Sequence, residues 1–445
     1  MTPCRLIALL VALVCGAPAS AAGPFELFGF NPRAKAMGGA QAATANDYTA
    51  TFYNPALLTT RATLNFGAAI GVVQPNAFIE LEQPQPDGSR YAPELPGTEG
   101  GLALGFDFPV GGKLGDHLAI GLGAYLPATE IARIRVLDPV VPQFYLYESG
   151  AARMEVMPAV AVRWLDWLST GVGLRATGGL SGPTYYTVDP VAGTVEHREF
   201  DTALVYRFAP TLGVALGPFY GFRLGATYRG ALSMLVNFPN NLDLAGMDLG
   251  MAMRVGTETV YSPHTAVLGI AYQAFEGALT LSADLQYVRW SDAPDPSVSF
   301  ALDTEGDDLE HLGLGDALDI PAPGMEREVR PAFRDTLVPR AGLEFAPLDF
   351  LFVRAGYYYQ PTPVPNQTSG SNYVDNNAHA LSSGVGVVFS DPLEIFANPI
   401  SVDASAQVLL LMERSARKAN GNDPVGDWRA GGQVFDFALS IIYAY

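Results

Sequence analysis

Hydrophobic and polar residues alternate with a period of two along most of the chain after residue 60. In residues 221–232, for example, the even positions are mostly apolar or aromatic, whereas the odd positions are small, polar or Arg. A period of two is typical of a β-strand with two different environments on its faces. A soluble sandwich would carry many Lys and Glu on its polar face, so this pattern favours strands with lipid on one side and a lumen on the other.

Fourteen segments follow this pattern. They are residues 62–74, 100–109, 117–127, 155–164, 168–180, 202–216, 221–232, 251–273, 278–290, 335–346, 350–359, 379–389, 400–413 and 436–445. Residues 251–273 are interpreted as one strand bent at Pro263, although Ser262, Pro263 and His264 could also form a turn between two strands. An even strand number favours the single strand, because bacterial single-chain barrels prefer even numbers.

The connections between these segments alternate between long polar loops and short turns, as in outer-membrane barrels with long external loops and short periplasmic turns. Both chain ends then lie on the periplasmic side. We therefore expect an all-β fold, a 14-stranded antiparallel transmembrane β-barrel over residues 61–445, with long extracellular loops.

Composition supports this class of protein. Hydrophobic residues make up 49% of the chain and charged residues only 16%, with a formal net charge of −19. The excess of acids argues against nucleic-acid binding, which needs concentrated positive charge. No run of about 20 apolar residues follows residue 22, as a helical membrane span would require.

Residues 1–22 are expected to be a signal peptide, with Arg5 in the charged region, an apolar stretch over residues 6–14 and small residues at 19–22. Both cysteines, Cys4 and Cys15, fall inside it, so disulfides and thiolate sites are not expected in the exported chain. Lipid attachment at Cys15 is an alternative that the bulky Val14 before it disfavours. The expected location is the outer membrane of a Gram-negative bacterium.

Residues 23–60 do not read as a strand. They are rich in small side chains, which allow close backbone packing against a barrel wall. We expect this segment to be a plug, or hatch, in the lumen; the alternative is an unattached periplasmic tail.

Several short motifs resemble the FadL/TodX family of outer-membrane transporters for hydrophobic compounds. They are Met-Gly-Gly-Ala at 37–40, Ala-Asn-Asp at 45–47, Asn-Pro-Ala at 54–56, Leu-Gln-Tyr-Val-Arg-Trp-Ser at 285–291, Phe-Arg-Asp-Thr at 333–336, and Val-Arg-Ala-Gly-Tyr at 353–357 with Pro-Thr-Pro-Val-Pro at 361–365. Their order and spacing cover almost the whole chain. The resemblance implies a 14-stranded barrel, an N-terminal hatch whose motif residues are Gly38, Gly39, Asp47, Asn54 and Pro55, and diffusion of long-chain fatty acids or other hydrophobic molecules. The ligand varies within the family, and some relatives serve secretion instead.

Strand parity places seven arginines on the lumen face: Arg163, Arg175, Arg207, Arg223, Arg229, Arg340 and Arg354. An arginine in a partly dehydrated lumen can hold a carboxylate in a bidentate pair. Arg223, Arg229, Arg340 and Arg354 are therefore candidates for an acidic head group. The alternative for each is a structural ion pair that fixes the plug, with Asp47, Asp284, Glu344 or Asp403 as partners.

Residues 131–147 form a loop with an unusually large number of apolar side chains. A contiguous apolar patch ordinarily marks a binding site, so Val141, Phe144 and Leu146 are candidates for capture of a hydrophobic ligand. The alternative is that the loop folds over the barrel mouth and packs on neighbouring loops.

The acidic loop at 291–334 could hold calcium but lacks EF-hand spacing. Neither a metal nor a cofactor is expected. The five histidines are scattered and no Gly-x-Ser-x-Gly motif occurs, so an enzyme is not expected either.

The sequence thus predicts uptake of hydrophobic small molecules, most specifically long-chain fatty acids, through a plugged barrel that is surrounded by outer-membrane lipid and is monomeric. A secretion scaffold of the same fold and a general porin remain as alternatives.

Overall fold

The structure is a computed structural model that describes residues 24–444 apart from 61–62, 87, 90, 111–116, 129–139, 148–153, 182–183, 190–193, 201–202, 245–249, 295–298, 306–331, 369–370, 392–397 and 420–422. The predicted signal peptide at 1–22 and most of the acidic loop lie outside the described residues, as do residues 131–139 of the apolar loop.

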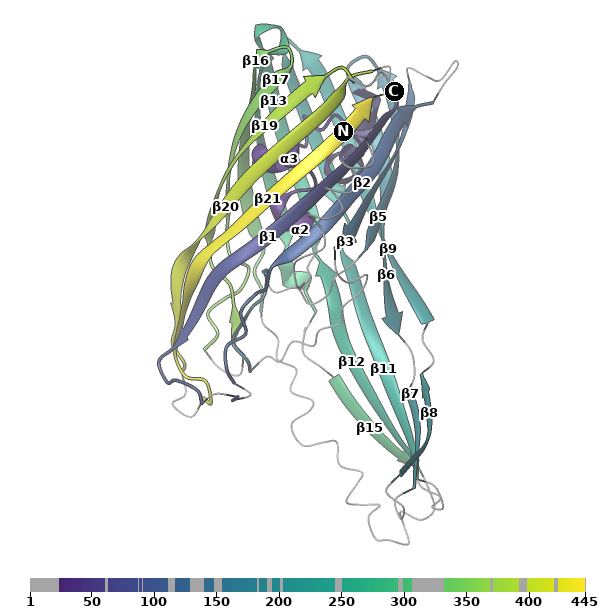
Figure 1. Cartoon of the computed structure of the whole chain (residues 1–445), viewed down its shortest axis with the longest axis vertical. Helices are drawn as coiled ribbons and strands as arrows, with labels where there is room; N and C mark the ends of the chain where they lie inside the picture. Colours follow the sequence, from purple (N-terminus) through teal and green to yellow (C-terminus); the bar gives the residue numbers. More distant parts are fainter. Residues whose placement is uncertain are drawn as a thin grey trace, which may run out of the picture.

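Fourteen antiparallel strands close into a barrel, as the alternation predicts (Figure 1). In order around the wall they are Asn65–Leu81 (β1), Glu99–Pro109 (β2), Leu118–Pro127 (β3), Glu155–Leu165 (β5), Leu168–Ser181 (β6), Ala203–Phe219 (β9), Phe222–Arg229 (β10), His264–Ala274 (β13), Leu279–Arg289 (β14), Thr336–Leu348 (β16), Leu351–Gln360 (β17), Ala378–Phe389 (β19), Ile400–Ala416 (β20) and Trp428–Ala444 (β21). Strand β1 pairs with β21 over its whole length and closes the barrel. Each of these described strands is therefore paired on both sides, which is what hydrocarbon surroundings require.

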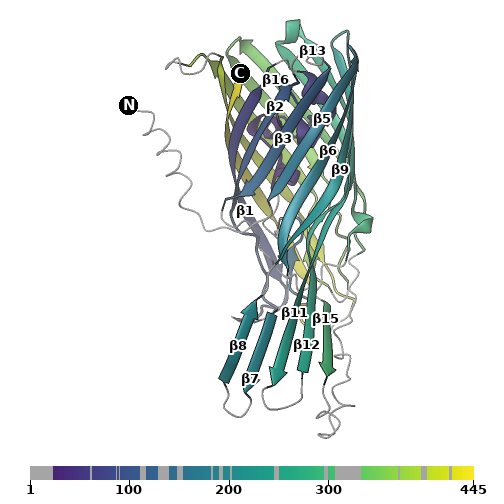
Figure 2. The same ribbon diagram turned by 90° about the vertical axis from the view of Figure 1, so that its right-hand side faces the viewer.

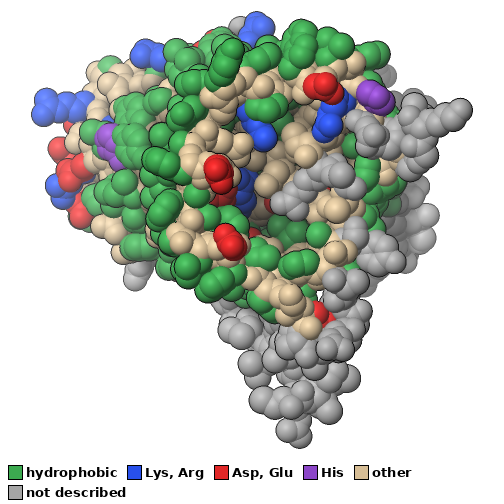
Figure 3. Space-filling view, turned by 90° about the horizontal axis from the view of Figure 1, so that it is seen from above, with side chains coloured by type: hydrophobic (Ala, Val, Ile, Leu, Met, Phe, Trp, Pro, Cys, Tyr) green, Lys and Arg blue, Asp and Glu red, His purple; other side chains and the backbone are tan. Residues whose placement is uncertain are grey.

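The two faces of the strands have the environments that the alternation predicts. On β10, Phe222 and Leu224 are exposed on the outside, whereas Thr227 and Arg229 are buried inside. On β21, Phe437 is exposed outside and Asp436 is fully buried. Figure 3 looks onto the upper end of Figure 1 and shows charged side chains in the hollow within the rim, with hydrophobic side chains around its outside.

The interpretation of residues 251–273 as one bent strand is wrong. Pro263 separates β13, which belongs to the barrel, from Gly250–Ser262 (β12), which belongs to a second sheet. Proline has no N–H to donate to a ladder, so the chain can change sheets there. The alternation continued across this boundary, which hid it in the sequence.

The second sheet extends beyond the barrel on the side of the long loops (Figure 2). Its order is β15 (Ser299–Glu305), β12, β11 (Leu232–Leu244), β7 (Thr184–Asp189) and β8 (Thr194–Phe200). The short turns and the C-terminus lie at the other end, which we assign to the periplasm because short turns are typical of that side.

The N-terminal segment, residues 24–60, lies inside the barrel. It folds into the short helices α2 (Pro24–Phe28), α3 (Pro32–Ala36) and α4 (Ala50–Tyr53) and the 3-10 helix η1 (Pro55–Thr60). Nearly all of its side chains are buried, and α3 contacts β17, β19, β20 and β21 whereas η1 contacts β5, β6 and β9. The segment thus contacts opposite sides of the barrel interior. Among the described residues, no helix has the length and apolarity to cross a membrane.

Candidate functional site: a plugged lumen below an apolar mouth

One network of buried charges joins the N-terminal segment to the barrel wall. Arg33 on α3 donates from Nε and Nη2 to the two carboxylate oxygens of Glu344, at 2.8 Å each. Arg354 donates to the same carboxylate at 2.6 Å and to Asp403 at 2.5 Å. Glu344 and Arg354 are directly opposite each other on β16 and β17, so the strand register builds the acceptor that α3 binds. Arg354, a candidate for ligand binding, is therefore paired with two carboxylates of the barrel wall.

Two further ion pairs attach the segment at other points. Lys35 on α3 donates to Asp436 on β21 at 2.7 Å, and both side chains are buried. On the opposite wall, Arg175 pairs with Glu155 at 2.5 Å and with Glu26 on α2. A buried charge that loses its partner is strongly unfavourable, so these contacts fix the segment in one position.

The hatch-motif glycines allow the closest backbone approach to the wall. Gly38 and Gly39 have φ of 62° and 74°, and a Cβ on Gly38 would lie 2.9 Å from the carbonyl oxygen of Ala341. A Cβ on Gly39 would lie 2.6 Å from the guanidinium of Arg340. The positive φ favours glycine at both positions, and at Gly38 the close backbone of the wall leaves no space for a side chain either.

The other hatch-motif residues shape the segment. Asp47 accepts hydrogen bonds from the Thr49 amide at 2.8 Å and from Asn31 at 3.0 Å, so these hydrogen-bond partners lie within the segment. Asn54 donates to the Ala42 carbonyl at 2.7 Å and to that of Val214 on β9 at 3.0 Å. Pro55 begins η1.

Arg229 and Arg340 have a different environment from Arg354. Both line a small cavity of about 20 Å³ between the N-terminal segment and the wall, together with Phe25, Glu26, Gly29, Gly39, Ala42, Phe52, Tyr53, Val267, Asp284 and Gln286. The Arg229 guanidinium lies 4.5 Å from the Phe52 ring centroid, and that of Arg340 lies 4.4 Å from the Tyr358 ring centroid. Arg229 donates a hydrogen bond to the backbone carbonyl of Phe52, and Arg340 donates one to that of Gly38. Within the described part of the chain, neither forms an ion pair with a carboxylate.

The remaining predicted lumen arginines lie apart from this cavity. Arg223 is half-buried, six residues before Arg229 on β10, which corresponds to about 20 Å along a strand. Arg163 is half-buried near the periplasmic end of β5, and Arg207 on β9 is exposed. The structure therefore brings together only two of the four arginines that the sequence indicated for ligand binding.

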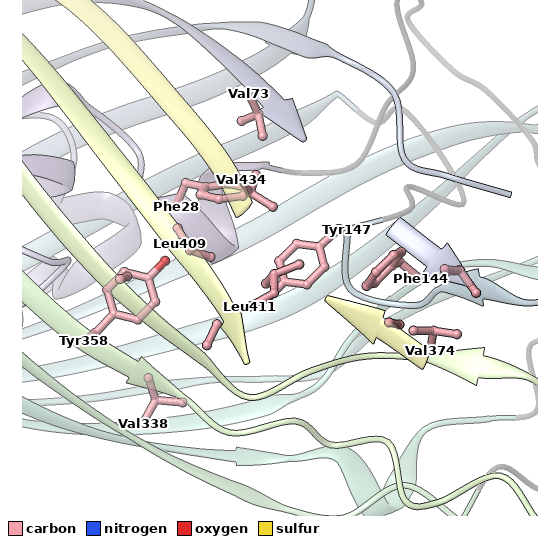
Figure 4. Close-up of a cluster of buried hydrophobic side chains, with 14 of the residues drawn as sticks. Phe28, Val73, Phe144, Tyr147, Val338, Tyr358, Val374, Leu409, Leu411 and Val434 are labelled. Atoms are coloured by element: carbon pink, nitrogen blue, oxygen red, sulfur yellow. The ribbon is translucent and has the colours of Figure 1, made fainter. Parts of the chain in front are cut away.

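The mouth of the barrel is filled by apolar side chains (Figure 4). Phe144, Tyr147 and Val374 from the loops pack in one cluster with Leu411 on β20 and Phe28 on α2. Gln143–Phe144 (β4) pairs with Tyr373–Val374 (β18), so two distant loops form a cover, the mouth cap, which we define as residues 140–147, 361–368 and 371–377. The cap packs against the N-terminal segment, because Phe28 belongs to the same cluster as Phe144 and Tyr147.

The candidate capture residues belong to this cap and are not an open patch. Val141 and Phe144 are buried, at 6% and 0% exposure, and Leu146 is partly buried against the same cluster. The described part of the loop thus folds over the mouth, which is the alternative that the sequence left open. Its apolar side chains face the interior.

Two contributors to the site carried no clear signal in the sequence. Tyr358 is fully buried, belongs to the apolar cluster and packs against Arg340. Glu26 lines the cavity and pairs with Arg175. The alternation marked the parity of Tyr358, but only the folded register shows which arginine it meets. In the described part of the chain there is no group of three residues that could ligate a metal.

A closed strand barrel with a folded segment in its lumen and an apolar mouth defines the class of outer-membrane transport channels. The chain belongs to the family described as outer membrane protein transport protein (OMPP1/FadL/TodX), whose model matches residues 11–409. This family transports hydrophobic compounds and its members are channels. The membership also supports the outer-membrane location.

Solved structures show the same fold. A Pseudomonas aeruginosa FadL homologue superimposes with a TM-score of 0.62 at 18% identity, covering 93% of this chain and 98% of that one. The Pseudomonas putida toluene transporter TodX gives a TM-score of 0.56 at 14% identity, covering 94% and 99%. Alkane uptake protein A of Marinobacter nauticus is 22% identical over 224 residues, which are 50% of this chain and 45% of that protein. The chain thus matches less than half the length of this curated relative.

Proposed function

We propose that this protein admits long-chain fatty acids, which pass between the mouth cap and the N-terminal segment with the carboxylate near Arg229 and Arg340. The observation that carries this proposal is the meeting of the apolar cluster and the arginine-lined cavity at Tyr358. That ring packs in the cluster, and the Arg340 guanidinium lies 4.4 Å from its centroid. An amphipathic acid matches this order of environments.

The apolar part of the path supplies the affinity. Burying about four methylenes of an acyl chain contributes roughly 3 kcal/mol at about 0.8 kcal/mol each. The acyl chain would take the place of Phe144 and Leu146 in the apolar cluster. The cluster would then pack against the ligand in place of these two side chains. Such an exchange permits binding without trapping.

The polar part supplies the preference for an acid. Arg229 and Arg340 are buried and have aromatic rings and carbonyls as partners. A carboxylate gives a charge-assisted hydrogen bond, which contributes about 1.5–3 kcal/mol. A plain alkane or a monoaromatic hydrocarbon has no group for this cavity, so the acid should bind more tightly than the alkane of equal length.

The test compares hexadecanoate with hexadecane on the purified protein in lipid nanodiscs. Arg229→Gln/Arg340→Gln should weaken hexadecanoate binding about tenfold or more, since 1.4 kcal/mol corresponds to a factor of ten. Hexadecane binding should not change. Arg223→Gln is the matched control, because that arginine lies outside the cavity.

Each result has one consequence. If the double variant binds both ligands as the wild type does, the arginines are not a head-group site and the proposed preference for an acid is wrong. If the wild type binds neither ligand, the fatty-acid proposal is wrong, and a role in secretion becomes the better explanation.

A further inference from the structure

Four neighbouring turns at the periplasmic end each carry an exposed aromatic side chain. They connect β5 to β6, β9 to β10, β13 to β14 and β16 to β17, which are eight consecutive strands of the wall. We call Trp167, Tyr220, Phe275 and Phe350 the aromatic arc; they are exposed by 45%, 100%, 77% and 53%. The hairpin of β13 and β14 stands at the top of Figure 1.

The arc is continuous with aromatic residues at the strand ends. The ring centroids of Trp167 and Phe219 lie 6.1 Å apart, and this contact links the first turn to the second. The ring centroids of Phe222 and Tyr272 lie 4.6 Å apart, and this contact links the second hairpin to the third. These contacts join the first three hairpins into one aromatic surface, and Phe350 lies on the next hairpin of the wall.

Two of the arc residues are disfavoured by their own backbone. Tyr220 and Phe275 have φ of 51° and 52°, the left-handed region that L side chains rarely adopt. In the turn between β9 and β10, Tyr220 is followed by Gly221 at φ 85°, and Asn-Gly is the pair that such two-residue turns prefer. A fully exposed aromatic in this position gains neither burial nor local stability within the chain, which points to a partner outside it.

Acids accompany the aromatic residues. Asp166, Glu276 and Asp349 are exposed beside Trp167, Phe275 and Phe350, respectively, and none of the four turns contains Lys or Arg. Carboxylates this close favour contact with water over insertion among lipids. A surface of aromatic rings with acidic neighbours is complementary to an apolar surface with a basic rim.

We propose that the aromatic arc is the docking surface for a soluble periplasmic protein that presents an apolar patch rimmed by Lys and Arg. The inference goes beyond the proposed transport function and does not depend on which ligand is carried.

The first experiment tests whether the arc faces water. The chain has no cysteine outside residues 1–22, so Tyr220→Cys and Phe275→Cys each accept a single nitroxide label. With the protein reconstituted in nanodiscs, an aqueous nickel chelate should accelerate the electron-spin relaxation of both labels, and oxygen dissolved in the lipid should not. The opposite result would show that the arc is a lipid anchor and overturn the proposal.

The second experiment tests the partner. A benzophenone is attached to the thiol of the Tyr220→Cys variant and exposed to periplasmic extract, and the captured protein is purified and titrated against wild-type protein in nanodiscs. Binding should saturate and should weaken as the salt concentration rises. The affinity should fall at least tenfold in the triple variant Asp166→Lys/Glu276→Lys/Asp349→Lys. It should also fall at least tenfold in the double variant Tyr220→Asn/Phe275→Asn. Asn fits the left-handed conformation, so the latter variant should fold. Tyr185→Asn, which removes an exposed tyrosine of the outer sheet, is the control. Capture of nothing, or binding indifferent to both sets of variants, overturns the proposal.

Discussion

The N-terminal segment and the mouth cap are both buried in the same barrel, but opposite kinds of contact hold them. The segment is fixed by charged pairs such as Arg33 with Glu344 and Lys35 with Asp436. The cap is held by apolar packing, with Phe144 and Tyr147 in a cluster that reaches α2. Buried ion pairs demand one geometry, whereas apolar packing tolerates exchange of one apolar group for another.

This difference matches the two tasks of a channel for hydrophobic molecules. A hydrophobic ligand can replace the side chains of the cap, because it offers the same kind of contact. Its acyl chain cannot replace the charged pairs of the N-terminal segment, such as Arg33 with Glu344 and Lys35 with Asp436, so these pairs persist while the mouth is occupied. The comparison predicts that the two regions respond in opposite ways to substitution.

The largest effect is expected for Arg354→Met. The change leaves Asp403, which is 3% exposed, without its arginine and removes one partner of Glu344. Breaking a buried pair in this way costs about 3–5 kcal/mol. Urea unfolding of the protein in bilayers measures it, with Arg223→Met as the control. A loss below about 1 kcal/mol, less than the ordinary cost of a broken buried pair, would mean that the network does not hold the segment.

The next effect locates the edge of the polar region on β10. Leu224→Arg places a charge on the lipid face and should cost roughly 2–4 kcal/mol if it lies near the bilayer midplane. Thr227→Arg should also be poorly tolerated, because Thr227 is 5% exposed, between Gly225 and Arg229, which both meet the N-terminal segment. A lumen face open to solvent would have accepted that arginine.

Deleting residues 24–60 separates these two causes. In the deleted protein, Thr227→Arg should no longer impair folding, whereas Leu224→Arg should still impair it. The folded fraction in bilayers measures both effects. Rescue of both variants, or of neither, would contradict the placement of the segment against β10.

A smaller effect concerns a charge within the cap itself. Asp375 is fully buried, and neither of its carboxylate oxygens accepts a hydrogen bond of good geometry. Burial raises its pKa to about 7 from an ordinary value of 3.8, although Thr362 and Arg414 favour the ionised form. The closed cap therefore holds a proton that the open cap releases, so closure is most stable at low pH and weakens as the pH rises from about 4 to 7.

Asp375→Asn removes this charge and should stabilise the closed cap by about 1–3 kcal/mol above pH ~7. At pH ~4, near the ordinary pKa of an aspartate, the variant and the wild type should be alike. Hydrogen exchange of residues 140–147, corrected for intrinsic rates, measures the difference. A gain that is independent of pH would show that the carboxylate does not titrate in this range.

The barrel could be predicted because each strand carries its own evidence. Lipid on one side and a lumen on the other impose a period of two, and each of the fourteen predicted segments overlaps one barrel strand, although β1 and β21 extend further than predicted, to Leu81 and from Trp428. The second sheet was missed because β7, β8 and β15 lie in segments that read as polar loops. Likewise β12 was merged with β13, since the alternation passes Pro263 unchanged.

The sequence predicted which residues of the candidate site face the lumen or are apolar, but not which of them contact one another. Parity placed Arg340 and Arg354 in the lumen, but the strand register decides that Arg354 faces Glu344 and that Arg340 meets Tyr358. The apolar content of residues 140–147 was visible, whereas its burial depends on pairing with β18, far along the chain. Contacts of this kind are set by tertiary structure and leave no local pattern.

The smallest effect comes from matched conservative changes, one in each region. Phe144→Leu keeps an apolar side chain in the cap, so it should cost less than about 1.5 kcal/mol. Arg354→Lys keeps the charge but cannot place separate donors on Glu344 and Asp403, because an ammonium is a single point of charge. It should therefore be the more destabilising of the two, although both are conservative by residue class. Urea unfolding in bilayers compares them directly. Equal costs would mean that the mouth is packed as specifically as the network below, and the cap could then not exchange its side chains for a ligand.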